Sequence, residues 1–232
     1  MKVIRYVSVL LMLFFPVMVK AQDLKSLFVA MPDSVCPLLT AVNRADFGDF
    51  LDSGMKAVVK NRFDKPSEMK TMTKDYIKLN LTSANVWEMK LLPVNDSTMV
   101  ICVVKTFCLP AQDSSIEFYD TNWQKQKNSQ FIEMADESAF FRADLNTEQQ
   151  DSLAALKQSV GLTLVSIRLS EADCSLAMRC TSAEYMGKDE KKDFLRFVGP
   201  DVTYDWIDGR FVMNKTSTPL DVAAVKEEVL KR

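Results

Sequence analysis

The first part of the chain has its apolar residues at helical spacing. Asp23 can cap a helix whose apolar positions lie three or four residues apart: Leu24, Leu27, Phe28 and Met31. A second helix, capped by Asn43 and ended by Gly54, is expected to have one apolar face: Phe47, Phe50 and Leu51. Residues 55–78 show a mixed pattern that Pro66 interrupts.

Further along the chain, the apolar residues recur with a period of two. Trp87, Met89 and Leu91 alternate with the charged residues Glu88 and Lys90. Side chains in a strand point alternately to opposite faces, so this alternation predicts a half-buried strand with one apolar and one charged face.

The next run, residues 99–109, is apolar at both odd and even positions, with Lys105 as its only charge. This pattern predicts a strand in the middle of a sheet that is covered on both faces. The residues Asn95-Asp96-Ser97 predict a turn before it, and residues 115–119 predict a further strand after it.

Helix and strand patterns return in the second part of the chain. Thr147 and Gln150 fit a capping box at the start of a helix, and Gly161 is expected to end that helix. Strands are expected over residues 162–169, 174–180, 194–198 and 202–206, and Asp208-Gly209 predicts a tight turn before Phe211. The mixed-charge run 188–192 suggests a solvated turn, and residues 221–232 a short amphipathic helix.

These elements predict an α+β fold, with an antiparallel β-sheet and packed helices, because most joins between strands are short. We expect a single domain over residues 22–232. The order of helix and then strands occurs twice, so a duplication would divide this domain into similar halves, residues 22–135 and 145–215.

The N-terminus has the pattern of a secretory signal. Lys2 and Arg5 precede an apolar run, residues 6–19, and Ala21 stands before the expected cleavage point. A membrane anchor is the alternative, but the run of about 14 residues is shorter than the roughly 20 that a spanning helix needs. Residues 1–21 are therefore expected to be removed, which leaves a periplasmic or secreted protein without a transmembrane span.

Charge and composition exclude several function classes. Cleavage would remove three basic residues and no acidic one, so the net charge changes from −2 to −5, and no nucleic-acid partner is expected. The chain has no histidine, the commonest general base and metal ligand, and only 6 glycines. We expect no cofactor, no metal and no nucleophilic catalysis. Asp46, Asp49 and Asp52 could gather a cation, but the solvated face of a helix explains them better.

The chain has 5 cysteines: Cys36, Cys102, Cys108, Cys174 and Cys180. The spacing within 102/108 and within 174/180 corresponds to about 20 Å along a strand, at about 3.3 Å per residue, so neither pair can form a disulfide within its own strand. Disulfides between strands stay open as an alternative to buried free thiols. Because the count is odd, one thiol must stay outside any intramolecular disulfide.

Aromatic and acidic residues occur together at the ends of two expected strands, and they are the candidate binding residues: Tyr119, Asp120, Trp123, Tyr204, Asp205 and Trp206. Exposed aromatic rings there would suit an envelope protein or a glycan as partner. The alternative is a carboxylate-dependent glycan hydrolase that uses Asp120 and Asp205, which requires both acids to face one cleft.

Three Asp-Ser dipeptides, each followed by Val, Thr or Leu, resemble the periplasmic O-glycosylation signal of some Gram-negative anaerobes. Their serines are Ser34, Ser97 and Ser152. Turn and cap chemistry explains the same dipeptides equally well.

Several longer motifs resemble an uncharacterised exported family of Gram-negative anaerobes, of the Bacteroidales type, over most of the mature chain. They are Met31-Pro32-Asp33-Ser34, Pro37-Leu38-Leu39, Asn43-Arg44, Asp46-Phe47, Asp49-Phe50-Leu51-Asp52-Ser53-Gly54-Met55, Glu88-Met89-Lys90-Leu91-Leu92-Pro93 and Phe118-Tyr119-Asp120-Thr121-Asn122-Trp123. The family is a domain of unknown function, so the resemblance implies export and a shared fold but no reaction. We therefore expect an exported, non-catalytic binding or structural module of the cell envelope.

Overall fold

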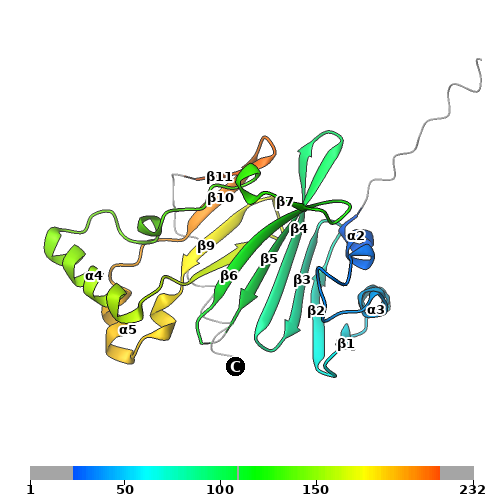
Figure 1. The fold of residues 1–232 in the computed structure, drawn as a ribbon, viewed down its shortest axis with the longest axis horizontal. Helices are drawn as coiled ribbons and strands as arrows, with labels where there is room; N and C mark the ends of the chain where they lie inside the picture. The colour runs from blue at the N-terminus through cyan, green and yellow to red at the C-terminus, as the bar shows by residue number, and fades with distance from the viewer. Residues whose placement is uncertain (1–22, 109, 215–232) are drawn as a thin grey trace, which may run out of the picture.

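Two antiparallel sheets form the centre of the fold (Figure 1). The structure is a computed structural model that describes residues 23–108 and 110–214. The larger sheet follows the order of the chain: β1 (Val58–Lys60), β2 (Pro66–Met72), β3 (Tyr76–Thr82), β4 (Asn85–Asn95), β5 (Thr98–Phe107), β6 (Asp113–Asp120) and β7 (Lys125–Gln126). The smaller sheet has the order β11 (Arg210–Met213), β10 (Val202–Ile207), β9 (Leu176–Cys180) and β8 (Val165–Leu169).

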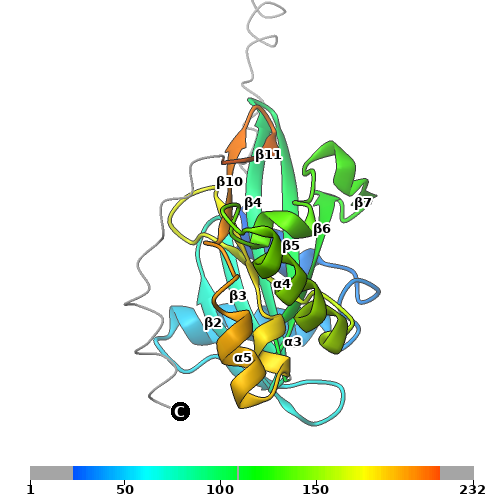
Figure 2. The same ribbon diagram turned by 90° about the vertical axis from the view of Figure 1, so that its left-hand side faces the viewer.

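The helices lie on different sides of the large sheet. α2 (Leu24–Ala30) and α3 (Ala41–Asp52) cover one face, and the small sheet covers the other (Figure 1). α4 (Thr147–Val160) and α5 (Lys188–Phe194) lie together at one end of the molecule in Figure 1, the end that faces the viewer in Figure 2. Short 3₁₀ helices are η1 (Asn128–Gln130), η2 (Glu137–Phe140) and η3 (Ser182–Tyr185). The predicted α+β class is confirmed.

The predicted division into similar halves is not confirmed. The first part of the chain builds seven strands in one continuous meander, whereas the second part builds the four-stranded sheet. The two parts instead share one hydrophobic core, because the small sheet packs against one face of the large sheet.

Strands β4 and β5 supply side chains to two hydrophobic cores. Met89 and Val103 point toward α2 and α3, while Leu92 and Val104 point toward the small sheet. All four are fully buried. The prediction that residues 99–109 include a strand covered on both faces is therefore confirmed.

The expectation of a half-buried β4 is wrong. Glu88 and Lys90 are only 5% and 1% exposed, because the small sheet covers the face on which they lie. Alternation of charged and apolar residues normally marks one solvated face. Here polar groups of the small sheet take the place of water, as described below.

Two stretches adopt other structures than the sequence pattern suggests. Residues 55–78 contain β1 and β2, and Pro66 begins β2, where a proline costs little ladder pairing. The run 188–192 belongs to α5 rather than to a turn, and the strand expected over 194–198 is absent. Phe194 ends α5 instead and packs edge-on against Phe141, with ring centroids 5.7 Å apart.

Asp23 caps α2 as expected, whereas the N-caps of α3 and α4 are shifted from their expected positions. Thr40 caps α3, and Asn43 is its partner in the capping box rather than the cap. Asn146 and Gln149 form the box of α4. The expected ends hold: Gly161 is left-handed after α4, with φ 75°, and the Asp208-Gly209 turn joins β10 to β11.

Two expected segments, the signal of residues 1–21 and the helix of residues 221–232, lie outside the described residues. Among the helices that the structure describes, none has the length and apolar character needed to cross a bilayer.

Candidate functional site

Tyr119 and Trp123 lie in the core under α2. Each is 6% exposed, and their ring centroids are 5.5 Å apart. The Trp123 Nε1 donates a hydrogen bond of 2.9 Å to the carbonyl oxygen of Leu27. Trp123 thus joins the turn after β6 to the first helix, and both rings are buried in the core rather than exposed at its surface.

Tyr204 and Trp206 lie on the opposite side of the large sheet. Tyr204 is 1% exposed, and its hydroxyl donates to the Glu133 carbonyl oxygen at 3.1 Å. The half-buried Trp206 donates from Nε1 to the Pro93 carbonyl oxygen at 2.6 Å and lies edge-on to Phe211. The fold therefore does not bring the two predicted aromatic sets together.

The two candidate acids also lie apart. Asp120 accepts hydrogen bonds from the backbone amides of Asn122 and Gln124, at 2.8 and 2.9 Å, and so organises a turn. Asp205 is exposed on the outer face of the small sheet, beside Asn214. The two carboxylates thus have separate partners on different elements, and neither lines the groove described below, so the paired arrangement that glycoside hydrolysis requires is not seen.

The three aspartates of α3 do not converge either. Asp52 pairs with Lys25 at 2.5 Å, and Asp49 is exposed. Within residues 23–108 and 110–214, no group of three or more potential ligands could hold a metal ion. Asp49 and Asp52 are exposed, which agrees with the interpretation of this side of α3 as a solvated face.

None of the five thiols is in a disulfide bond in the structure of the described residues. Cys36, Cys102 and Cys180 are buried, and Cys108 and Cys174 are half-buried. Burial raises the pKa of the Cys36 thiol, and burial together with the nearby Glu88 raises that of Cys102. A protonated, buried thiol behaves as a small apolar side chain.

Glu88 forms the centre of a buried polar cluster between the sheets. One carboxylate oxygen accepts from the Tyr76 hydroxyl at 2.9 Å, and the other accepts from the Leu169 amide at 3.2 Å. Burial and the charge of Glu88 raise the pKa of Tyr76, which keeps the phenol protonated. Lys78 approaches the same carboxylate at 3.7 Å from the solvent side.

Lys90 extends this cluster along β4. Its ammonium group pairs with Asp75 at 3.0 Å and donates to the Glu171 carbonyl oxygen at 3.0 Å. It also lies 5.8 Å from the centroid of the Tyr76 ring. These groups satisfy one another, so the buried charges have a structural explanation.

The same kind of contact closes the outer edge of β8. Alternate amides of this strand donate to side chains of the large sheet: Val165 to Asp113 at 3.3 Å, Ile167 to Ser114 at 2.9 Å and Leu169 to Glu88 at 3.2 Å. Unpaired edges invite pairing with other chains. Side chains of β4 and β6 therefore occupy the positions that another strand would need.

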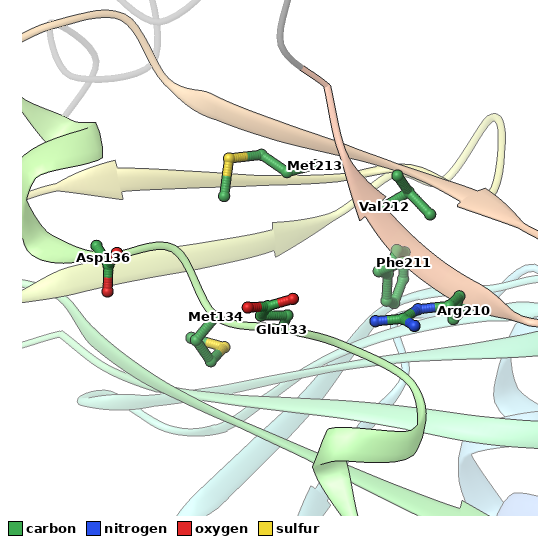
Figure 3. Close-up of a pocket in the computed structure, with 7 residues that line it drawn as sticks. All are labelled: Glu133, Met134, Asp136, Arg210, Phe211, Val212 and Met213. Carbon is green, nitrogen blue, oxygen red and sulfur yellow. The ribbon is translucent and has the colours of Figure 1, made fainter. Parts of the chain in front are cut away.

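An open groove lies beside β11, at the other edge of the small sheet (Figure 3). It has a volume of about 430 Å³. Its lining comes from β11 and from the segment that precedes η2: Glu133, Met134, Asp136, Arg210, Phe211, Val212 and Met213. This combination of a sheet edge, apolar side chains and charges makes the groove the candidate binding site.

The groove has an apolar floor and charged walls. Phe211 is 1% exposed, whereas Met134 and Val212 are 48% and 41% exposed. In Figure 3 Met134 and Met213 lie on opposite sides of the cavity. The exposed side chains of Glu133, Asp136 and Arg210 have no ion-pair partner within the part of the chain that the structure describes.

No pattern in the sequence predicts this groove. Residues 133–136 have no clear period, and the Asp208-Gly209 signal predicts only the turn before Phe211. The available signal was the Glu-Met-Ala-Asp run, in which exposed acids flank a methionine outside any regular element.

All three serines of the Asp-Ser dipeptides are exposed: Ser34, Ser97 and Ser152. The Ser152 hydroxyl donates to the Glu148 carbonyl oxygen within α4. Glycosylation at these positions stays a prediction.

Comparisons with other proteins give a family and a fold. The family model "Protein of unknown function (DUF3256)" matches residues 16–211. A solved domain of an uncharacterized protein from Porphyromonas gingivalis W83 is similar, with a TM-score of 0.73 and 27% identity, over 83% of this chain and 98% of that chain. No functionally curated protein matches.

Proposed function

Because the chain belongs to the DUF3256 family of proteins of unknown function, we propose a role from its geometry: an exported, non-catalytic binding module of the cell envelope. The partner is a protein or glycan of that compartment. The pattern of residues 1–21 supports export to the periplasm or beyond. The motif resemblance supports a Gram-negative host of the Bacteroidales type.

The groove beside β11 is the observation that carries this proposal. Met134, Val212 and Met213 offer flexible or exposed apolar surface, which methionine-rich binding sites use to fit their partners. The buried charges of Glu88 and Lys90 are already occupied, by the Leu169 amide of β8 and by the Glu171 carbonyl oxygen in the loop that follows it. In the groove, by contrast, Glu133 and Arg210 keep their charges available for a partner.

Export can be tested by following the N-terminus in the native host. The mature chain should appear outside the cytoplasm, with Gln22 as its first residue. A Leu11→Lys variant, which interrupts the apolar run, should stay inside with residues 1–21 attached. A wild-type chain that remains cytoplasmic with an intact N-terminus would contradict export.

Binding can be tested by cross-linking in the same cells. We expect a stoichiometric companion that is lost in the double variant Met134→Glu/Val212→Glu. Val42→Glu is the matched control, because Val42 is an apolar residue of α3 that is 68% exposed and lies outside the groove. Equal recovery of the companion in both variants would contradict a role for the groove.

A further inference from the structure

The direction of the backbone groups along β11 shows which amides face the groove. The Asn214 amide donates to Thr203, and the Phe211 amide donates to Phe131 on the other side. Successive backbone groups of a strand point in opposite directions. The Met213 amide therefore points the same way as that of Phe211, away from β10.

The chain itself begins to pair with this edge and then departs from it. Ile132 forms a single parallel bridge with Phe211, and the Phe211 amide donates to Phe131 at 2.7 Å. Residues 133–136 then form the far wall of the groove instead of a strand. The groove thus opens where no strand within residues 23–108 and 110–214 pairs with the outer edge of β11, unlike the edge of β8, which side chains close.

We propose that the groove binds an extended segment of a partner protein, which adds to β11 as an edge strand. Main-chain hydrogen bonds to the outward groups of Met213 would hold such a segment, as in other cases of strand addition. The cavity of about 430 Å³ falls within the range of about 300–1,000 Å³ that is usual for binding pockets. This inference rests on the proposed binding function.

Charge and side-chain character define the segment. Its apolar side chains, at every second position, would pack on Phe211, Met134 and Met213. Glu133 and Asp136 have no ion-pair partner among the described residues, and they outnumber Arg210, the one cation of the lining. This excess of negative charge favours a lysine or arginine on the segment. The partner is therefore a protein with an exposed, extended segment in which apolar residues alternate with polar and basic ones.

The test uses two labelled eight-residue peptides and the full mature chain. The basic probe is acetyl-KVTVKVTV-amide, and the acidic probe has Glu in place of each Lys. Fluorescence anisotropy should show saturable binding of the basic probe, with at least tenfold weaker binding of the acidic probe. The double variant Glu133→Gln/Asp136→Asn should reduce this preference to less than threefold.

A proline tests the main-chain contact itself. Met213→Pro removes the outward amide, but it should leave the pairing with β10 intact because that amide is not donated to β10. We expect at least tenfold weaker binding of the basic probe. Met213→Ala keeps the amide and should bind within threefold of the wild type, and unchanged thermal unfolding of both variants confirms their folding.

Three outcomes would overturn the inference. They are no binding of the basic probe at 1 mM, equal binding by Met213→Pro and wild type, or a dimer in sedimentation that Met213→Pro dissociates. The last result would assign the edge to a second copy of the chain. A cross-linked companion that Met213→Pro retains would leave the proposed function standing while strand addition fails.

Discussion

The Glu88 carboxylate accepts a hydrogen bond from the Leu169 amide at 3.2 Å, across 81 positions of the chain. Its other oxygen accepts from the Tyr76 hydroxyl, so one side chain of β4 joins the neighbouring strand to the edge of the small sheet. This contact connects the two sheets without any strand shared between them.

Replacing Glu88 should strongly lower the stability of the fold. Glu88→Ala leaves two buried donors without an acceptor, at a cost of about 1–3 kcal/mol for each such group. We expect a loss of about 3 kcal/mol in urea unfolding, and a smaller loss for Glu88→Gln, which keeps one acceptor. The exposed control Asp49→Ala should change stability by less than about 0.5 kcal/mol. A Glu88→Ala variant as stable as this control would refute the role.

Asp75 and Lys90 should respond unequally to substitution. Lys90 is buried with its side chain 2% exposed, whereas the Asp75 side chain is 48% exposed. Asp75→Ala would leave a buried cation without its counter-charge, which should lower the free energy of unfolding by about 3–5 kcal/mol. Lys90→Met should lower it less, because water can reach the carboxylate that remains. The double variant should be more stable than Asp75→Ala alone. Equal losses for both single variants, measured by urea unfolding, would be inconsistent with this picture.

Glu117 should make stability depend on acid pH. Burial opposes its charge, but hydrogen bonds from Lys105, Lys125 and Tyr119 outweigh burial and lower the pKa of Glu117 from its ordinary 4.5 to about 2. A lowered pKa stabilises the folded state above pH 4.5, and this contribution is lost as the pH falls from 4.5 toward 2.

Thermal unfolding of wild type and Glu117→Gln should therefore differ most near neutral pH and converge near pH 2. The control Glu148→Gln, on the exposed start of α4, should follow the wild type throughout. Parallel curves for wild type and Glu117→Gln would show that the ion pairs do not stabilise the fold.

Gly209 and Gly161 form a matched pair for testing close packing. Both are left-handed, with φ of 78° and 75°. An alanine Cβ at Gly209 would lie 2.9 Å from the Val94 carbonyl oxygen, whereas nothing lies within 4 Å at Gly161. Gly161→Ala should lose about 1–2 kcal/mol from backbone strain alone. Gly209→Ala should lose clearly more, and equal losses in urea unfolding would count against tight packing of this turn on β4.

The exposed serines give a prediction about modification. If the dipeptide signals are used, the protein from the native host is heavier than its sequence, and the triple change of Ser34, Ser97 and Ser152 to alanine removes the excess. Intact mass spectrometry measures this directly. An unmodified mass for the natively exported chain would refute the prediction.

Local patterns were sufficient for much of the fold. The period of two in β4, the apolar run of β5 and the Asp208-Gly209 turn each depend on neighbouring residues, and each predicts an element that the structure contains. The caps of α3 and α4 were placed at the wrong residues, because Ser, Thr, Asn and Asp compete for the same position.

Contacts between distant parts of the chain could not be predicted in this way. Glu88 and Lys90 are covered by β8 and the loop that follows it, where their partners lie 81 residues later, and no local pattern indicates that the small sheet will cover them. The groove was missed for the same reason, since Met134 and Met213 become neighbours of one cavity only in the folded chain. The aromatic residues Tyr119 and Tyr204, expected at exposed strand ends, are buried in the core.

The shared wall formed by β4 and β5 has a consequence for how the molecule comes apart. If these strands unfold, both hydrophobic cores lose one side at once. The helices α2 and α3 and the small sheet then have no apolar surface against which to pack. Unfolding should consequently be all-or-none, and the amide hydrogens of β4 and β5 should exchange with solvent more slowly than those of any other strand.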